Sequence, residues 1–466
     1  MTQNKPREQF ASRLGFILMT AGCAIGLGNV WRFSYITGQY GGGFFVLLYL
    51  IFLVMLGFPV MLMELAIGRA GRSTFPGAFR KLQNPASRFA WYRPAYLLFS
   101  GNLILLMFYS VITGWLLLYA CGFITGKFAG ATTVECSEIF SDMQADPTQQ
   151  IIGMLISVLL TVLACWGGVR KTVEKSIKVM MIGLFMLLIL LVVQSLSLPN
   201  AKSGLSFFLK PDLNNFINEG WISAVHAAMA QAFFTLSLGI GSIAVCGSYT
   251  SSDASLPREG LWIISLDTMV AIASGLIIFP ACAAFGIKAD AGPPLVFITL
   301  PNVFNNMTGG SFWGFLFFSF LSIAALSTLI AVFENLVAFG MDEWNWSRRK
   351  SCSIFGTALA VLSLPCIWGF NWWQGFQPLG ANSNILDLED FIVSNNLLPL
   401  GALFMTVFCF SRYGWRAENL FRELDHKKSI VLPRVLVFYL RWIISLIILL
   451  LWLVGWQQKF WPDLLK

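Results

Sequence analysis

Apolar segments long enough to cross a bilayer recur along the whole chain, and they constrain its fold more than any other feature. A membrane-spanning helix needs about 20 mostly apolar residues, and we identify eleven such segments among the 466 residues. Only 12% of the residues are charged, against about 25% in an ordinary soluble domain. We therefore predict an all-α polytopic membrane protein, a single transport domain over 1–466 whose solvent is the lipid bilayer. The predicted segments are 13–36, 42–69, 90–124, 151–168, 177–197, 222–249, 259–287, 312–343, 351–370, 388–411 and 433–457.

The distribution of basic residues predicts the orientation of these segments. With eleven segments and a cytoplasmic N-terminus, 24 of the 31 Lys and Arg residues fall on the inner side and 7 on the outer side. This bias is typical of cytoplasmic loops, so we expect a multi-pass protein of the cell (inner) membrane with its C-terminus outside. The same bias explains the formal charge of +8 without a nucleic-acid partner.

Glycine clusters interrupt two of the segments. The first contains Gly22, Gly26 and Gly28, and the sixth contains Gly239 and Gly241. Glycine in a helix interior costs about 1 kcal/mol relative to alanine, and irregular backbone at membrane depth is tolerated only where protein or a polar cavity covers it. Each cluster alone could equally serve close helix packing, but together they predict two broken helices around a site.

The two interrupted segments stand five helices apart. This spacing is typical of a five-plus-five inverted repeat with a binding site at the membrane midplane. The first repeat would cover 1–197 and the second 222–411, and 433–457 would form the eleventh helix.

Several ordered motifs resemble those of the neurotransmitter:sodium symporter family, specifically its bacterial amino-acid transporter branch. The resemblance covers nearly the whole chain, and the inverted-repeat architecture is already established for that family. The motifs are Arg13-Leu14-Gly15-Phe16, Gly26-Leu27-Gly28-Asn29 with Trp31-Arg32-Phe33, Gly41-Gly42-Gly43, Gly57-Phe58-Pro59 with Glu64, Gln231 to Gly239, and Ala324 to Thr328.

The resemblance implies two sodium sites and no organic cofactor. The first site would use the Ala24 carbonyl, Asn29, Thr235, Asp267 and the substrate carboxylate. The second would use the Gly22, Ile25 and Ala324 carbonyls with the Ser327 and Thr328 hydroxyls. Hydroxyls such as the last two can also simply bond their own helix backbone.

A carboxylate at Asp267 needs a reason, because insertion at the bilayer centre costs about 2.5–3.5 kcal/mol. In chloride-dependent relatives this position resembles an Asn, and a bound chloride supplies negative charge nearby. The resemblance therefore implies chloride-independent transport.

The same resemblance implies an amino-acid site between the two breaks. Gly26 stands where monoamine transporters place an Asp, which leaves room for a substrate carboxylate, and Tyr109 would help to hold it. Most of the remaining pocket residues are apolar, which favours a hydrophobic or aromatic amino acid. The implied substrate residues are Cys23, Ala24, Gly26, Gly28, Leu105, Tyr109, Phe234, Thr235, Ser237, Ile240, Thr328 and Val332.

Two conditional ion pairs would act as gates. Arg32 and Asp390 would close the outer side, and Arg7 and Asp342 the inner side with Tyr249 nearby. Exposed pairs contribute only about 0–1 kcal/mol, which suits contacts that break in every cycle.

The function indicated is sodium-coupled import of an amino acid by alternating access. A proton-coupled or exchange transporter of the same fold is the alternative. A channel lacks a visible ring of pore charges, and an enzyme is disfavoured because the chain has 2 His and no nucleophile pattern. The sequence does not determine the exact substrate, the sodium stoichiometry or the oligomeric state.

Overall fold

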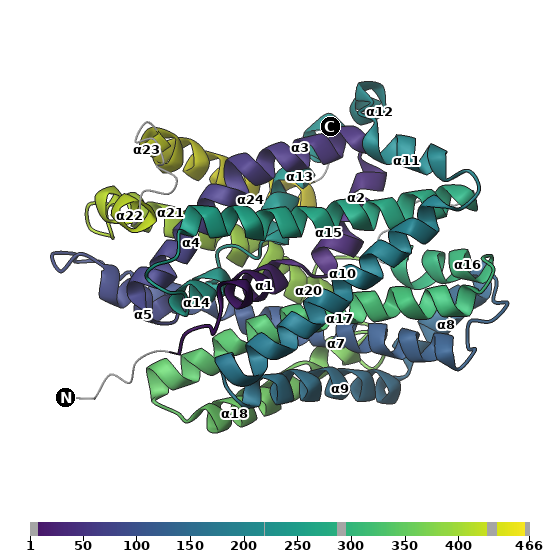
Figure 1. Cartoon of the computed structure of the whole chain (residues 1–466), viewed down its shortest axis with the longest axis horizontal. Helices are drawn as coiled ribbons and strands as arrows, with labels where there is room; N and C mark the ends of the chain where they lie inside the picture. Colours follow the sequence, from purple (N-terminus) through teal and green to yellow (C-terminus); the bar gives the residue numbers. More distant parts are fainter. Residues whose placement is uncertain (1–7, 219, 287–294, 426–435, 462–466) are drawn as a thin grey trace.

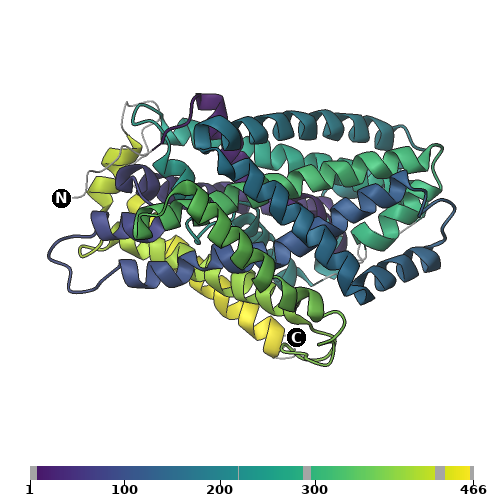
Figure 2. The same cartoon turned by 90° about the horizontal axis from the view of Figure 1, so that it is seen from below.

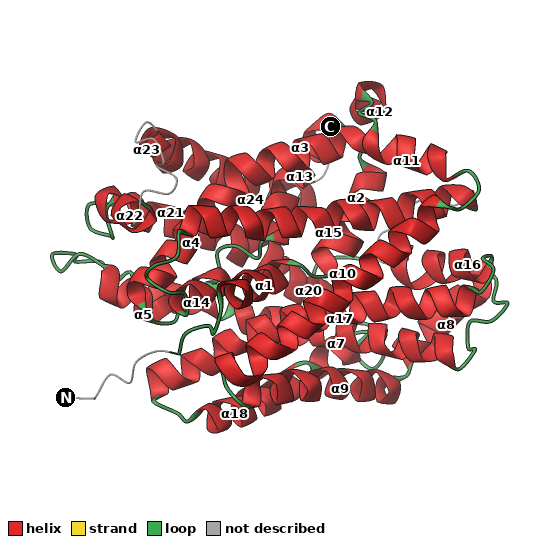
Figure 3. Ribbon diagram, viewed as in Figure 1, coloured by secondary structure: helices red, strands yellow, loops and turns green. Residues whose placement is uncertain are grey.

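A computed structural model describes residues 8–218, 220–286, 295–425 and 436–461. Every regular element in these ranges is helical (Figure 3). The elements up to residue 218 are α1 (Arg13–Ala24), η1 (Gly28–Arg32), α2 (Phe33–Gln39), α3 (Gly43–Phe52), η2 (Leu53–Gly57), α4 (Phe58–Gly71), α5 (Phe75–Leu82), α6 (Tyr92–Phe99), α7 (Gly101–Ile124), α8 (Thr133–Ala145), α9 (Pro147–Trp166), η3 (Val169–Val173), α10 (Glu174–Leu196), α11 (Ala201–Leu209) and α12 (Leu213–Asn218).

The later elements begin at Trp221. They are α13 (Trp221–Thr235), α14 (Ser242–Ser248), α15 (Leu256–Ala284), η4 (Leu295–Thr299), α16 (Leu300–Asn305), α17 (Gly310–Trp344), α18 (Arg348–Leu362), α19 (Leu364–Trp368), α20 (Ile385–Asp390), η5 (Phe391–Leu397), α21 (Leu398–Phe410), α22 (Ala417–Leu424), α23 (Leu436–Phe438), η6 (Tyr439–Ile443) and α24 (Ile444–Phe460). The η elements are π-helical turns, and each of the six in the described residues continues directly into an α-helix.

The membrane-spanning helices agree with the predicted segments. Among the described residues, nine helical stretches are long and apolar enough to cross a bilayer, and a tenth is the pair α1 and Gly28–Gln39, bent by 57°. The sixth predicted segment forms α13 and α14, which are separated by residues 236–241. Counting these two helices as one span gives eleven, and that count stays a prediction because neither is long enough alone.

The long helices run roughly side by side, so that their connections gather at two ends (Figure 1). The helices α5, α22 and α23 lie at one end and α8, α11 and α16 at the other, and the separation holds in the perpendicular view (Figure 2). The connections rich in Arg and Lys, such as those at 72–93 and 411–417, belong to the first end, which we term the basic end.

Glycines allow the broken sixth segment to pack closely against α4. A Cβ atom at Gly68 would lie 1.8 Å from the Ala244 carbonyl oxygen, and one at Gly247 would lie 2.5 Å from the Leu65 carbonyl oxygen. Only glycine permits backbones to approach this closely. This close packing holds α14, and therefore the half of the sixth segment that follows the break, against α4.

Candidate functional site

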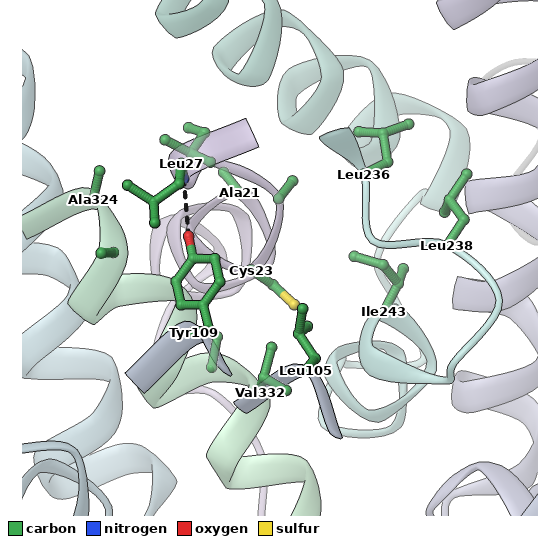
Figure 4. Packing of buried hydrophobic residues seen from close by; sticks show 14 of the residues in the cluster. Ala21, Cys23, Leu27, Leu105, Tyr109, Leu236, Leu238, Ile243, Ala324 and Val332 are labelled. Atoms are coloured by element: carbon green, nitrogen blue, oxygen red, sulfur yellow. Dashed lines mark hydrogen bonds between the residues drawn. The ribbon is translucent and has the colours of Figure 1, made fainter. Parts of the chain in front are cut away.

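The backbone of the first broken helix loses its regular hydrogen bonds at two successive amides. The amide of Gly26 donates to Asn29 Oδ1 at 3.1 Å, and the amide of Leu27 donates to the Tyr109 hydroxyl at 2.9 Å (Figure 4). In an uninterrupted helix both would donate to carbonyl groups four residues earlier in α1. The break therefore leaves carbonyl oxygens that need other partners.

Some of these oxygens meet α17 at the second implied sodium site. Thr328 Oγ1 lies 3.1 Å from the Gly22 carbonyl oxygen and 3.0 Å from that of Ile25. It also lies 3.4 Å from the Ala324 carbonyl oxygen, to which Ser327 donates at 2.8 Å. One hydroxyl proton cannot serve three carbonyl groups fully. The cluster thus has more oxygen acceptors than donors, which is the composition that a hard cation prefers.

The side chains of the first implied sodium site also lie together. Asn29 Nδ2 donates to Thr235 Oγ1 at 2.9 Å and to Asp267 Oδ1 at 2.8 Å, and Thr235 Oγ1 donates to Asp267 Oδ2 at 3.0 Å. All three residues are buried. A half-turn of the Asn29 amide would give up its bond from the Gly26 amide and bring its oxygen beside the other two groups, so three oxygen ligands from α15, α13 and η1 can converge here.

Left-handed backbone forms the break in the sixth segment. Ser237, Gly239 and Gly241 have φ angles of 50°, 101° and 84°. A Cβ at Gly239 would lie 2.2 Å from the Leu398 carbonyl oxygen, and one at Gly241 would lie 2.5 Å from the Phe75 side chain. Both glycines are therefore needed for conformation and for space.

Glu64 on α4 binds backbone amides of this break and of the half-helix that follows it, α14. Its carboxylate accepts hydrogen bonds from the amides of Gly239 at 2.9 Å, Ile243 at 3.2 Å and Ala244 at 3.4 Å. These amides belong to the break and to the N-terminus of α14, where a helix presents unpaired donors and the positive end of its dipole. The buried carboxylate therefore supplies hydrogen-bond acceptors for these backbone amides from inside the protein.

A small enclosed cavity of about 20 Å³ lies between the two breaks. Its lining consists of Ala24, Gly26, Gly28, Leu105, Tyr109, Phe234, Thr235, Ser237, Thr328 and Leu398. A Cβ at Gly26 would lie 2.4 Å from the Tyr109 hydroxyl, and one at Gly28 would lie 2.6 Å from the Phe234 ring. This volume holds about one water molecule, so admitting an amino acid requires the surrounding side chains to move.

Three of the implied substrate residues lie outside that lining. Cys23, Ile240 and Val332 are fully buried. The Cys23 sulfur points toward Leu105 (Figure 4). The Ile240 side chain packs against α7, where a Cβ added at Gly101 would lie 2.8 Å from it. In this conformation these three side chains pack outside the cavity lining.

A cation–π contact lies over Phe234, one of the residues that line the cavity. The Arg32 guanidinium lies 4.1 Å from the centre of the Phe234 ring. Asp390, the expected partner of Arg32, instead accepts a hydrogen bond from Ser394 at 2.6 Å. Although both residues are in the described part of the chain, they form no ion pair here, so the outer pair stays a prediction for another conformation.

A bidentate ion pair joins α17 to α18. Arg348 donates to both carboxylate oxygens of Glu334, at 2.8 and 2.7 Å. The same carboxylate accepts from the Tyr249 hydroxyl at 3.0 Å, and Arg348 also donates to the Cys165 carbonyl at 2.9 Å. Because Glu334 is fully buried, removing Arg348 would leave an uncompensated charge.

The implied inner gate can be placed only in part. Asp342 accepts hydrogen bonds from the Thr74 amide at 2.8 Å and the Ser73 hydroxyl at 3.2 Å. Arg7 lies outside the described residues. The third residue implied for this gate, Tyr249, donates its hydroxyl hydrogen bond to Glu334.

Sequence reasoning did not assign three parts of this arrangement. Glu64 entered only as a motif residue, although a carboxylate in an apolar segment is itself a signal of function. The Glu334–Arg348 pair could have been suspected for the same reason. Leu398 carried no signal, because an apolar residue in an apolar helix is ordinary.

Comparisons with known proteins agree with this arrangement. The sequence model of the "Sodium:neurotransmitter symporter family" matches residues 7–151 and 140–368. The sodium-dependent transporter YhdH of Bacillus subtilis is 34% identical over 408 residues, which is 88% of each chain. A sodium-dependent transporter of Haemophilus influenzae is 31% identical over 460 residues, covering 97% of this chain and 99% of the relative.

A solved structure shows that the likeness extends to the fold. The crystal structure of MhsT in complex with L-phenylalanine superposes with a TM-score of 0.85 and 37% identity, covering 96% of this chain and 100% of the MhsT chain. The chain is thus a multi-pass membrane transporter and not an enzyme, and it belongs to the Sodium:neurotransmitter symporter family.

Proposed function

We propose that this transporter imports a hydrophobic or aromatic amino acid together with sodium. The observation that carries the proposal is the cavity between the two helix breaks, nine of whose ten lining residues are those that the family resemblance assigns to the substrate. Alternating access would expose this cavity to one side of the membrane at a time. The two proposed repeats, 1–197 and 222–411, would move against each other around it.

The polar end of the cavity would bind the substrate carboxylate. No side chain occupies Gly26, and the Tyr109 hydroxyl and Thr328 Oγ1 lie 2.4 and 2.7 Å from where its Cβ would be. An aspartate there, as in transporters of amines, would repel a carboxylate. This supports an α-amino acid over a decarboxylated amine.

The other end would bind the side chain of the substrate. Leu105, Phe234 and Leu398 give it an apolar lining, and burial of apolar surface favours a matching side chain by about 25 cal/mol per Å². The solved complex of the related MhsT contains L-phenylalanine. The two observations together favour a large apolar side chain.

Two sodium ions would be co-transported at the clusters around Asn29 and Thr328. The first would contact the substrate carboxylate as well as Asn29, Thr235 and Asp267, so binding of cation and substrate would be coupled. Moving two net positive charges inward at a potential of 100 mV contributes about 4.6 kcal/mol. The basic end would face the cytoplasm.

Asp267 would make transport independent of chloride. It accepts hydrogen bonds from both Asn29 and Thr235, so its charge would lie directly beside the first cation. An added anion would then be unnecessary and would be repelled.

A thermal-shift screen of the twenty amino acids in sodium and in potassium tests the proposal. We expect the unfolding temperature to rise only with sodium, and most with phenylalanine, tryptophan or leucine. Uptake into proteoliposomes should keep its rate when gluconate replaces chloride, and Asp267→Asn should acquire a chloride requirement. Equal stabilisation in potassium would favour the proton-coupled or exchange transporter, and stabilisation only by polar amino acids would overturn the substrate class.

A further inference from the structure

A groove of about 840 Å³ lies at the basic end, where α21, α22 and the start of the last membrane helix meet. Three arginines line it: Arg412, Arg416 and Arg441. Glu418 is the carboxylate in the lining. Within the described ranges, no carboxylate forms an ion pair with any of the three arginines, and the described lining carries a net charge of +2.

Neighbouring groups hold the arginines in place without neutralising them. The Arg412 guanidinium lies 4.7 Å from the centre of the Tyr413 ring, and that of Arg441 lies 5.0 Å from the Trp442 ring. Arg416 Nε donates to the Arg412 carbonyl at 3.3 Å. Stacking on a ring leaves the N–H groups at the edge of a guanidinium free, and their fork geometry matches a phosphate group.

The same groove continues onto the surface that faces lipid. Its apolar lining includes Val407, Phe410 and Val437. Trp442 is 57% exposed, and exposed leucines such as Leu446 and Leu450 follow it along α24. Aromatic side chains of this kind favour the membrane–water interface, which would place the arginines at headgroup level and the apolar lining beside the acyl chains.

We propose that this groove binds an anionic phospholipid. The phosphate would bind between Arg412 and Arg441, and an acyl chain would follow Val407 and Phe410. A soluble phosphate would use the arginines alone, whereas a lipid uses the charged and the apolar lining together. In the orientation proposed above this is the cytoplasmic leaflet, but the site does not depend on the transport function.

The test is native mass spectrometry of the full-length protein released from nanodiscs that contain phosphatidylcholine with phosphatidylglycerol. The variant R412Q/R441Q removes two exposed charges from the groove. The matched control R88Q/R93Q removes two exposed charges at the same end, one from the connection between α5 and α6 and one from the first turn of α6. Unfolding temperatures of all three proteins check that they are folded, and R412K/R441K tests whether charge alone suffices.

We expect the unaltered protein and the control to retain one phosphatidylglycerol molecule through delipidation. R412Q/R441Q should bind it about thirtyfold more weakly, since each basic residue near an anionic surface contributes about a factor of five. R412K/R441K should bind with intermediate affinity, because lysine keeps the positive charge but lacks the paired N–H donors of a guanidinium.

Four outcomes would overturn the site. Equal retention of phosphatidylglycerol by R412Q/R441Q and the control would show that the arginines do not bind the lipid. Equal retention of phosphatidylcholine and phosphatidylglycerol would show that the groove does not prefer an anionic lipid. Displacement of the lipid by glycerol 3-phosphate at equal concentration would indicate a site for free phosphate, and a dimer that R412Q/R441Q dissociates would indicate that a second copy of the chain occupies the groove.

Discussion

The two broken helices differ in how the hydrogen-bonding groups of their interrupted backbone find partners. In the first, side chains take the displaced amides: Asn29 binds the Gly26 amide and Tyr109 the Leu27 amide. Carbonyl oxygens are then left to share the single proton of Thr328. In the sixth, both kinds of group have partners: the buried carboxylate of Glu64 binds displaced amides, and Asn102 donates to the Ile240 carbonyl at 2.7 Å.

This difference indicates that the first break binds cations, whereas the sixth break is held in place by the rest of the protein. A break with surplus acceptors can bind cations, whereas a break whose donors are already satisfied gains nothing from a second anion on the same side. The sixth segment therefore contributes to the site mainly through Thr235 and the adjoining lining, and its geometry is fixed by α4. Substitutions in the first break should mostly change binding, and those in the sixth should mostly change stability.

The largest effect should follow from Glu64→Ala. Three buried amides would lose their acceptor, and each unsatisfied group costs about 1–3 kcal/mol. We expect the variant to fail to accumulate as folded protein, or to lose most of its thermal stability in detergent. Size-exclusion chromatography and a thermal unfolding assay measure both.

Glu64→Gln is the matched control for this prediction. Its side-chain oxygen can still accept from one amide, while its NH2 group opposes the others. Its unfolding temperature should lie between those of the unaltered protein and Glu64→Ala. An unfolding temperature of Glu64→Ala close to that of the unaltered protein would show that Glu64 does not support the sixth break.

Gly26→Ala should weaken substrate binding at the first break while leaving the protein folded. The new Cβ would lie 2.4 Å from the Tyr109 hydroxyl and 2.7 Å from Thr328 Oγ1. Both atoms are at the ends of side chains, which can move, but then the carboxylate position is lost. We expect substrate affinity to fall at least about tenfold, equivalent to about 1.4 kcal/mol, as measured by isothermal titration.

Gly183→Ala provides the comparison, because nothing lies within 4 Å of a Cβ added there. It should bind substrate normally and be at least as stable as the unaltered protein. If Gly26→Ala binds substrate as tightly as Gly183→Ala, the carboxylate is bound elsewhere.

Thr328→Val should weaken sodium binding more than Ser327→Ala. Thr328 reaches the carbonyls of the break in α1, whereas Ser327 donates to Ala324 of its own helix at 2.8 Å. Losing a hydrogen-bonding group to a charge costs about 1.5–3 kcal/mol, so the half-saturating sodium concentration should rise at least about tenfold. Sodium titrations of the thermal shift give both values. Equal values for the two variants would mean that both hydroxyls contribute alike.

Much of this architecture could be predicted from the sequence, because bilayer and backbone impose strong local signals. Hydrophobic length defined the spans, and the cost of glycine in a helix marked both breaks. The π-helical hydrogen bonding of η1 has no such signal, because the residues that follow Gly28 in it are those that an ordinary helix also contains. The boundaries inside a broken helix therefore required the structure.

The parts that the sequence could not give depend on contacts between distant residues. Glu64 lies 175 positions from Gly239, whose amide it binds, and nothing local relates the two. Leu398 lines the cavity while Ile240 packs against α7, a difference set by the rotation of each helix about its axis. Apolar segments in a membrane protein carry little periodicity to fix that rotation.

The smallest effect should come from Ser237→Gly in the sixth break. Ser237 has a φ of 50°, a left-handed conformation that costs about 1–2 kcal/mol for a residue with a Cβ. Glycine removes this cost but loses about 0.5–1 kcal/mol of conformational entropy on folding, and the Ser237 hydroxyl gives up only a 3.5 Å bond to the Cys23 carbonyl. We expect a net gain in the free energy of unfolding of about 0.5–1 kcal/mol, measured as a rise in unfolding temperature. Asn200→Gly, at a φ of 59° outside both breaks, should change little, because asparagine tolerates this conformation. A clear loss of stability in Ser237→Gly would mean that the weak bond to Cys23 helps to hold the two breaks together, and the assignment of the sixth break to support by α4 alone would then be wrong.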